Sequence, residues 1–224
     1  MKVYRNMPRE LVDGWATSIV NHAGGQTFDF HYHEVEEWLE VLEGDICFVS
    51  AGGVEYPLFQ TQALNIPQGE VHQVRVGPNG VKYNMWLSAE VSDEDFSKKL
   101  GNQDLSLINK NLEVLKAEDS EDREFYRAFF DDFLFEEFTF RGADRKLLNK
   151  RAFLERAPAN FTRIESDSIR ILHQSPGIVL LSTVVHTQPK AGGARSSFTN
   201  FRLFVTEGDV GRCRVWINYP EPGD

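Results

Sequence analysis

The sequence predicts two domains, an all-β barrel or sandwich in the first half and an α+β domain in the second. Its length of 224 residues suits two domains of roughly 100 residues each. From residue 16 to residue 87, short β-type runs alternate with turn signals at intervals of about ten residues. Beyond Ser92 the pattern changes to a polar stretch, then to helical periodicity, and then back to strands.

The first half, assigned to residues 1–95, consists of short runs that we expect to form antiparallel strands. Gly-Asp, Gly-Gly, Pro-Gln-Gly and Gly-Pro-Asn-Gly sequences separate these runs, and such sequences favour tight turns. Even spacing of short strands is typical of antiparallel sandwiches and barrels. The runs are TFDFHYH, EWLEVLEG, DICFVSAGG, EYPLF, QALNIPQGE, VHQVRVGPNG and VKYNMWLS.

Residues 96–118 are predicted to connect the domains, with one or two short helical pieces, and the boundary falls between Ser92 and Ser120. A helix is predicted in EDREFYRAFFDDFLFEEF, where apolar residues at intervals of four give a wide stripe and Ser120 or Glu121 can begin the helix. A second helix is predicted at Lys146–Arg156. After Pro158 the strand-like runs are FTRIES, SIRILHQ, GIVLLSTVVHTQ, SSFTNFRLFVTEG and GRCRVWINY, so the second domain, 119–224, is α+β.

The charge distribution argues against a nucleic-acid partner. The net charge is −10, and residues 1–100 hold 7 Lys and Arg against 15 Asp and Glu. Such a chain repels a phosphate backbone, and no basic stripe offsets this repulsion. There is no apolar run long enough for a membrane span and no apolar segment typical of a signal peptide. Cys47 and Cys213 are expected to be reduced core residues, so a cytoplasmic location is expected.

Potential metal ligands are concentrated between Gly24 and Asp45. His31 and His33 are two residues apart, so on a strand they point to the same face and can converge on one ion. A cluster of four glutamates follows, and His72 lies on a later strand. Three imidazoles and one carboxylate suit a divalent transition metal such as Mn, Fe, Ni, Cu or Zn.

The spacing of these residues resembles the two cupin motifs over about residues 15–90. Pro67, Gly69 and His72 match the core of the second motif, and the first motif is matched at Gly25, His31, His33, Glu37 and Gly44. The resemblance implies a double-stranded β-helix barrel with His31, His33, Glu37 and His72 as the metal ligands. Glu36 is an alternative ligand if the hairpin slips by one residue.

Two positions depart from the second motif. Thr61 stands where the family usually has glycine, and Val76 stands where it often has asparagine. These changes affect a turn and a contact behind the ligands more than they affect ligation. The family includes dioxygenases, isomerases, epimerases, decarboxylases and simple binding proteins, so the fold does not choose an activity. Candidates for the pocket wall are Phe28, Tyr32, Gln60, Tyr83 and Trp86.

The second half resembles a SnoaL-like domain, related to ketosteroid isomerase, from about Glu121 to Tyr219. FYRAFFDDFLFEEFTFRG, RKLLNKRAFLER and NFRLFVTEGDVGRCRVWINY carry the resemblance, with Gly208 and Trp216 near its closing motif. It implies a cone-shaped α+β fold with a curved antiparallel sheet and a pocket between helix and sheet. Catalytic members use an acid or a histidine as a proton carrier. The polar candidates for this role are Tyr126, Asp132, His173 and His186.

The sequence therefore predicts a metal-dependent cupin-type enzyme that acts on a small organic molecule. Two alternatives remain open. In the first, the protein is a non-catalytic sensor whose metal helps to hold a small-molecule ligand. In the second, it is a structural protein with no metal at all. Both resemblances favour a homodimer. No Ser-His-Asp order, P-loop or dinucleotide-binding motif is present.

Overall fold

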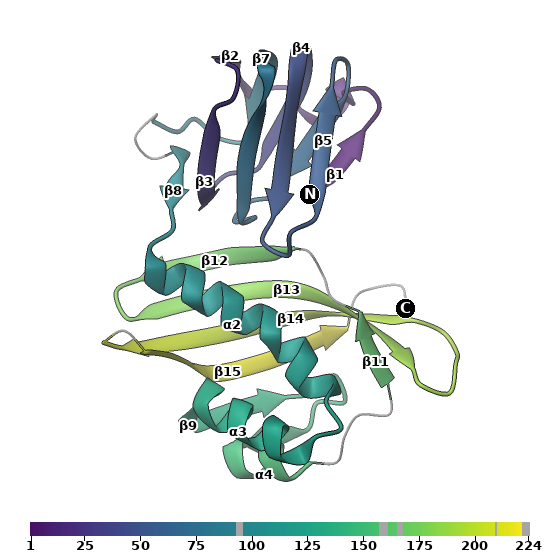
Figure 1. Cartoon of the computed structure of the whole chain (residues 1–224), viewed down its shortest axis with the longest axis vertical. Helices are drawn as coiled ribbons and strands as arrows, with labels where there is room; N and C mark the ends of the chain where they lie inside the picture. The colour runs from purple at the N-terminus through teal and green to yellow at the C-terminus, as the bar shows by residue number, and fades with distance from the viewer. Residues whose placement is uncertain (93–95, 157–160, 165–167, 209, 221–224) are drawn as a thin grey trace. The chain divides into compact units, whose positions relative to one another are not determined.

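A computed structural model describes residues 1–92, 96–156, 161–164, 168–208 and 210–220 of the chain (Figure 1). The chain divides into two compact units, Met1–Leu100 and Gly101–Asp224. Each unit is built on its own sheet, of eight strands in unit 1 and seven in unit 2 among the described residues. The predicted end of the first domain at residue 95 lies outside the described residues.

Unit 1 is an antiparallel β structure in which the long strands β4 and β7 form the centre. The sheet order is β1-β6-β4-β7-β3-β8, with β2 also paired to β7 and β5 to β4. One short 3-10 helix, Arg9–Leu11, precedes β2. The strands are β1 (Lys2–Tyr4), β2 (Ala16–His22), β3 (Thr27–Tyr32), β4 (Glu37–Ser50), β5 (Glu55–Phe59), β6 (Ala63–Ile66), β7 (His72–Leu87) and β8 (Lys98–Lys99).

β4 and β7 bend together because glycine allows their backbones to meet closely. The two strands pair along nearly their whole length, with register shifts on either side of Gly44. Gly44 has a φ of +77°, and a Cβ atom placed there would lie 2.0 Å from the carbonyl oxygen of Gly80. Only glycine fits this position without displacing backbone.

The core of unit 1 follows from the period-two alternation of β4 and β7. Leu39, Val41, Ile46 and Phe48 of β4 are buried in one cluster with Val74 and other apolar residues. Successive strand residues point to opposite faces, so this alternation places one apolar face in the interior. The histidines follow the same alternation at the ends of β3 and β7.

The described part of unit 2 contains three helices and a sheet of order β10-β9-β15-β14-β13-β11, with β12 paired to β13. β9 and β15 are parallel, and the other described pairs are antiparallel. The elements are α2 (Asn102–Asp119), α3 (Arg123–Phe133), β9 (Leu134–Arg141), β10 (Leu147–Asn149), α4 (Lys150–Glu155), β11 (Phe161–Ile164), β12 (Ile169–Ser175), β13 (Ile178–Pro189), β14 (Ser196–Glu207) and β15 (Val210–Pro220).

The helices differ from the predicted ones in length and position. Most of the predicted connecting segment, 96–118, is the 18-residue helix α2, which belongs to unit 2. α3 is capped by Asp122, whose carboxylate accepts hydrogen bonds from two backbone N–H groups of the first turn, and not by Ser120 or Glu121. It ends at Phe133 because the following residues pair as β9 with β10 and β15, so sheet pairing outweighs the continuing apolar pattern.

Aromatic side chains fill the space between the helices and the sheet of unit 2. Phe130 and Phe133 of α3, Phe153 of α4, Phe204 of β14 and Trp216 of β15 are at most 1% exposed. Their rings meet edge to face, for example Phe133 on Phe204 at 5.6 Å between centroids. The core of this unit is therefore rich in aromatic side chains.

Candidate metal centre

Strand register brings three distant histidines together in unit 1. His31 of β3 is the direct partner of His72 at the start of β7. His33 is the first residue after the end of β3 and lies two positions beyond His31. The pairing of β3 with β7 changes register between Phe28 and His31, so the pair of His31 and His72 lies beyond an irregularity in the two strands. The pairing therefore juxtaposes residues that are 41 positions apart in the chain.

The three imidazoles form a compact buried cluster. One ligand nitrogen from each of His31, His33 and His72 lies within 4.8 Å of the others. The side chains belong to residues that are 8%, 4% and 0% exposed, respectively. Ring centroids are 4.4 Å apart for His31 and His72 and 5.1 Å apart for the other two pairs.

Backbone carbonyl groups orient two of the rings. Nδ1 of His31 donates to the carbonyl oxygen of Asp29 at 2.7 Å, and Nδ1 of His72 donates to that of Glu70 at 2.9 Å. A neutral imidazole that donates from Nδ1 carries its lone pair on Nε2. Metal-binding histidines are usually held in this way by an outer partner. His72 Nε2 is buried and makes no hydrogen bond with the described residues.

Glu37, at the start of β4, stands beside the third ring. Its Oε2 lies 2.8 Å from Nδ1 of His33, yet neither atom completes a directed hydrogen bond. Two donor atoms on a single first-row ion lie about 3 Å apart, given metal–ligand distances of about 2.1 Å. The separation of these two atoms fits a shared ion. Buried polar atoms that lack hydrogen bonds are rare in proteins, so their convergence here fits a metal as well.

The electrostatics of the cluster favours neutral rings. Burial, and then the neighbouring rings of His31 and His33, hold the pKa of His72 well below its ordinary value. Burial also lowers the pKa of His31. Neutral imidazole is the form that binds metals. Near neutral pH, a metal that binds His31 and His72 therefore does not have to displace a proton from a charged ring.

Aromatic residues surround the cluster. The ring of Phe96 lies 4.0 Å from that of His33, and the ring of Phe48 lies 5.6 Å from that of His72. Burial and the Glu37 carboxylate raise the pKa of Tyr83, whose hydroxyl is 3.2 Å from Nε2 of His22. Phe96 does not stand out in the sequence as a site residue, because only the fold brings its ring next to that of His33.

The other candidates in the first half have different positions. Glu36 accepts a hydrogen bond from the amide of Asn65 at 2.7 Å, so this alternative to Glu37 is directed elsewhere. Phe28 is 37% exposed and contacts His22, and Gln60 is exposed. Tyr83 and Trp86 are buried in the apolar clusters, and Tyr32 is buried as well.

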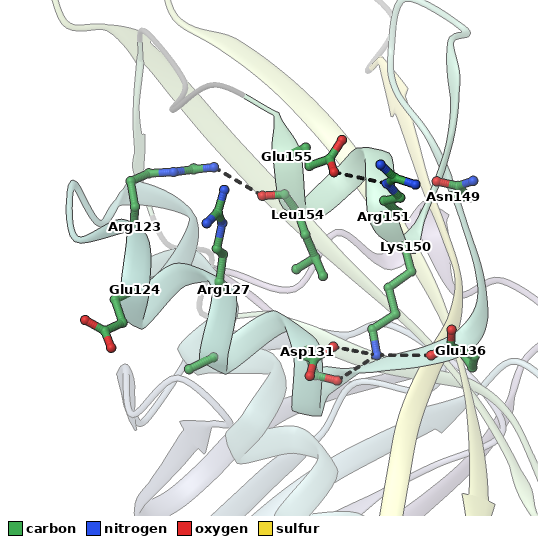
Figure 2. A pocket seen from close by; sticks show the side chains of 11 residues that line it. Arg123, Glu124, Arg127, Asp131, Glu136, Asn149, Lys150, Arg151, Leu154 and Glu155 are labelled. Atoms are coloured by element: carbon green, nitrogen blue, oxygen red, sulfur yellow. Dashed lines mark hydrogen bonds and ion pairs between the residues drawn. The ribbon is translucent and has the colours of Figure 1, made fainter.

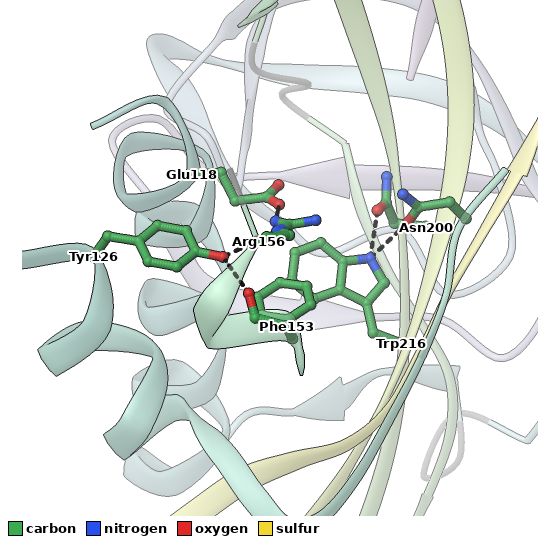
Figure 3. A network of polar contacts seen from close by, with 7 residues as sticks. Glu118, Tyr126, Phe153, Arg156, Asn200 and Trp216 are labelled. Carbon is green, nitrogen blue, oxygen red and sulfur yellow. Dashed lines mark hydrogen bonds and ion pairs between the residues drawn. The ribbon is translucent and has the colours of Figure 1, made fainter. Parts of the chain in front are cut away.

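The four candidates in the second half do not form one site. Tyr126 is buried, donates to the carbonyl of Phe153 at 3.1 Å, and accepts from Nε of Arg156 at 2.9 Å (Figure 3). Arg156 also pairs with the buried carboxylate of Glu118. Neither the arginine nor the glutamate had been singled out, since both appear in the sequence as ordinary charged helix residues.

Asp132 lacks the raised pKa that a buried general base would have. Its side chain is 62% exposed, and a hydrogen bond from Lys110 at 2.9 Å lowers its pKa. The two histidines lie on the sheet, where His173 is exposed on β12 and His186 is within hydrogen-bond distance of the Ser197 hydroxyl, at 2.9 Å. Asp132 is therefore an exposed, paired carboxylate, and its role as a proton carrier stays a prediction.

No helix of the described residues has both the length and the apolar character needed to cross a membrane. No protein-family model and no curated protein matches the sequence. Among solved structures, a DUF861 family protein of Thermotoga maritima is similar, with 20% identity and a TM-score of 0.31 over 38% of this chain and 97% of the other. A cupin-2 domain protein of Shewanella frigidimarina is similar at 21% identity and a TM-score of 0.28, over 31% of this chain and 66% of the other.

A third similar structure comes from Exiguobacterium sibiricum and is described as a Ca/calmodulin-dependent kinase II association domain. It has 14% identity and a TM-score of 0.42, over 61% of this chain and all of the other. These likenesses are too low for the activity of any of these proteins to be transferred to this chain. The prediction of an antiparallel all-β first half is confirmed for unit 1, whereas the cupin resemblance of unit 1 and the SnoaL-like resemblance of unit 2 stay predictions.

Proposed function

We propose that unit 1 binds a divalent transition metal and that the protein is a metal-dependent enzyme acting on a small organic molecule. His31, His33 and His72 hold the ion, and Glu37 supplies the fourth protein ligand. Manganese, iron, nickel, copper and zinc all accept such a set of three imidazoles and one carboxylate. The observation that carries the proposal is the convergence of three buried imidazoles, together with buried atoms of His33, His72 and Glu37 that complete no hydrogen bonds with the described residues.

The protein groups around the ion have separate tasks. The carbonyl groups of Asp29 and Glu70 hold two imidazoles in the tautomer that leaves Nε2 for ligation. Phe96 and Phe48 provide an apolar wall that excludes water and strengthens electrostatic interactions inside it. When bound, a metal of this kind polarises a carbonyl oxygen or activates water for attack on the substrate.

Metal analysis tests the ligand set directly. Protein purified without chelators should contain about one ion per chain by mass spectrometry, because four protein donors of one cluster bind one ion. The variant His72→Ala should lose the ion. His173→Ala is the matched control, because this histidine is exposed in unit 2. Wild-type protein that is folded and free of metal, and that takes up none on addition, would contradict the proposal.

Cobalt absorption gives a second readout that does not depend on activity. Metal-free protein titrated with Co²⁺ should develop visible bands, whose intensity reports four- or five-coordinate geometry. Glu37→Gln should retain binding but change these bands if the carboxylate is a ligand. Unchanged bands would restrict the set to the three histidines.

One observation favours a non-catalytic function instead, in which the metal holds a ligand for a sensor. The ionisable groups next to the imidazoles are poor proton carriers, because Glu37 pairs with His33 and Tyr83 has a raised pKa. Incubation of metal-loaded protein with a metabolite mixture separates the two functions. A compound that stabilises the protein and is recovered unchanged indicates a sensor, whereas a compound that is consumed indicates an enzyme.

A further inference from the structure

A cleft in unit 2 lies between α3 and α4 (Figure 2). Its volume is about 1050 Å³, at the upper end of the usual size of small-molecule sites. Four cationic side chains line it, two from each helix: Arg123, Arg127, Lys150 and Arg151. Four carboxylates line it as well, those of Glu124, Asp131, Glu136 and Glu155, so its capacity to hold an anion depends on which cations are already paired.

The two cations of α4 are neutralised within the cleft. Lys150 Nζ lies 2.9 Å from the carboxylate of Asp131 and 3.7 Å from that of Glu136. Nε of Arg151 donates to the carboxylate of Glu155 at 3.1 Å. Figure 2 shows these pairs on the α4 side. These two cations face three carboxylates, so this side carries no excess positive charge that could hold an anion.

The two cations of α3 lack such neutralisation. Neither Arg123 nor Arg127 has an ion pair with a carboxylate of the described residues. They are four residues apart and therefore lie on the same face of the helix, where like charges repel each other. In Figure 2 both guanidinium groups extend from α3 and end beside Leu154 of α4.

Arg123 is held in a fixed position with one donor unused. Its Nη2 donates to the carbonyl of Leu154 at 3.1 Å, and its guanidinium lies 4.7 Å from the ring centre of Tyr126. Its Nη1 is buried and makes no hydrogen bond with the described residues. A buried donor without an acceptor is costly unless a ligand supplies the acceptor.

We propose that this cleft binds a small organic anion through a carboxylate or phosphate group. Arg123 and Arg127 bind the anionic oxygens, since guanidinium groups match the geometry of such oxyanions with two parallel hydrogen bonds. Ala128 and Leu154, which also line the cleft, contact the apolar part of the ligand. This site is independent of the proposed metal centre and holds whether or not unit 1 binds metal.

An NMR titration of the full chain tests the proposal. Inorganic phosphate and succinate are added separately at constant ionic strength, and the Nε–H signals of the arginines are followed. Saturable shifts of the Arg123 and Arg127 signals are expected with at least one probe. Saturation by phosphate alone, by succinate alone or by both identifies the oxyanion that the site accepts. Absence of saturation with both probes would overturn the proposal.

Two variants distinguish specific binding of the anion in the cleft from nonspecific electrostatic attraction of the anion to the protein. Arg127→Gln should weaken binding by about tenfold or more, because a charged hydrogen-bond partner is lost. Arg127 is exposed, so this variant should keep the fold and the spectrum of the wild type. Lys116→Gln removes one exposed positive charge from α2 and should change the affinity by less than about twofold. An equal loss in both variants would also overturn the proposal.

Discussion

Two clusters of buried polar groups, one in each unit, differ in how fully they are hydrogen-bonded. In unit 2, Tyr126, Arg156 and Glu118 contact one another, and the indole N–H of Trp216 lies 2.7 Å from the side-chain oxygens of both Asn200 and Asn218 (Figure 3). In unit 1, one ligand nitrogen from each of three imidazoles lies within 4.8 Å of the others, and buried nitrogens of His33 and His72 complete no hydrogen bond with the described residues. Saturated polar clusters stabilise a fold, whereas unsaturated ones indicate a ligand.

The largest expected effect breaks the saturated cluster of unit 2. Arg156→Met should lower the free energy of unfolding by about 3 kcal/mol, because it leaves the buried carboxylate of Glu118 without its cation. Urea denaturation measures this loss. Arg151→Met is the control, since Arg151 is 86% exposed and its pair with Glu155 contributes at most about 1 kcal/mol. Metal content should be the same in both variants, and a loss of metal in Arg156→Met would show that the two clusters are coupled.

The second-largest effect is expected when a metal ion binds to the cluster of His31, His33 and His72 in unit 1. A metal present at 100 times its Kd should stabilise the protein by about 2.7 kcal/mol through binding to the native state alone. Thermal unfolding with and without chelator measures the difference. His72→Ala should abolish the response to metal, whereas His173→Ala should keep it. An equal response in both variants would place the metal outside the cluster.

The third prediction concerns pH in the metal-free protein. The pKa values of His72 and His31 are lowered by burial in the folded state, so below about pH 6.5 the unfolded chain binds more protons than the folded one. Stability should therefore fall as the pH drops from 7 to 5. His72→Gln should make this dependence shallower. Equally steep profiles for the two proteins would indicate that carboxylates outside the cluster cause the loss.

The smallest effect is expected at Asp132. Its exposed carboxylate pairs with Lys110 on the surface, so Asp132→Asn should change the free energy of unfolding by less than about 1 kcal/mol. Activity, once a substrate is found, should be unchanged as well. A strong loss of activity with normal stability would return this residue to the list of proton carriers.

Much of unit 1 could be predicted from the sequence because the alternation of β4 and β7 is a local signal. The turns expected at Gly44-Asp45 and at Gly77–Gly80 are not formed, since both sequences lie within the continuous strands β4 and β7. The pairing of His31 and His33 on one face also follows from strand geometry alone. The position of Phe96 could not be predicted, since it depends on how the chain returns after β7. The same holds for the end of α3, where pairing of β9 with β10 and β15 outweighs an apolar pattern that continues beyond Phe133.

By itself, the sequence determined a β-rich first half, an α+β second half, and the residue types and spacing of a metal site. Only the tertiary structure decided which donors meet, because His31 and His72 become neighbours through strand register and not through chain proximity. It also decided that the Tyr126 hydroxyl is hydrogen-bonded to Phe153 and Arg156 and that the Asp132 side chain faces solvent. Local patterns report which face of an element is buried, whereas hydrogen-bond saturation depends on groups that arrive from other elements.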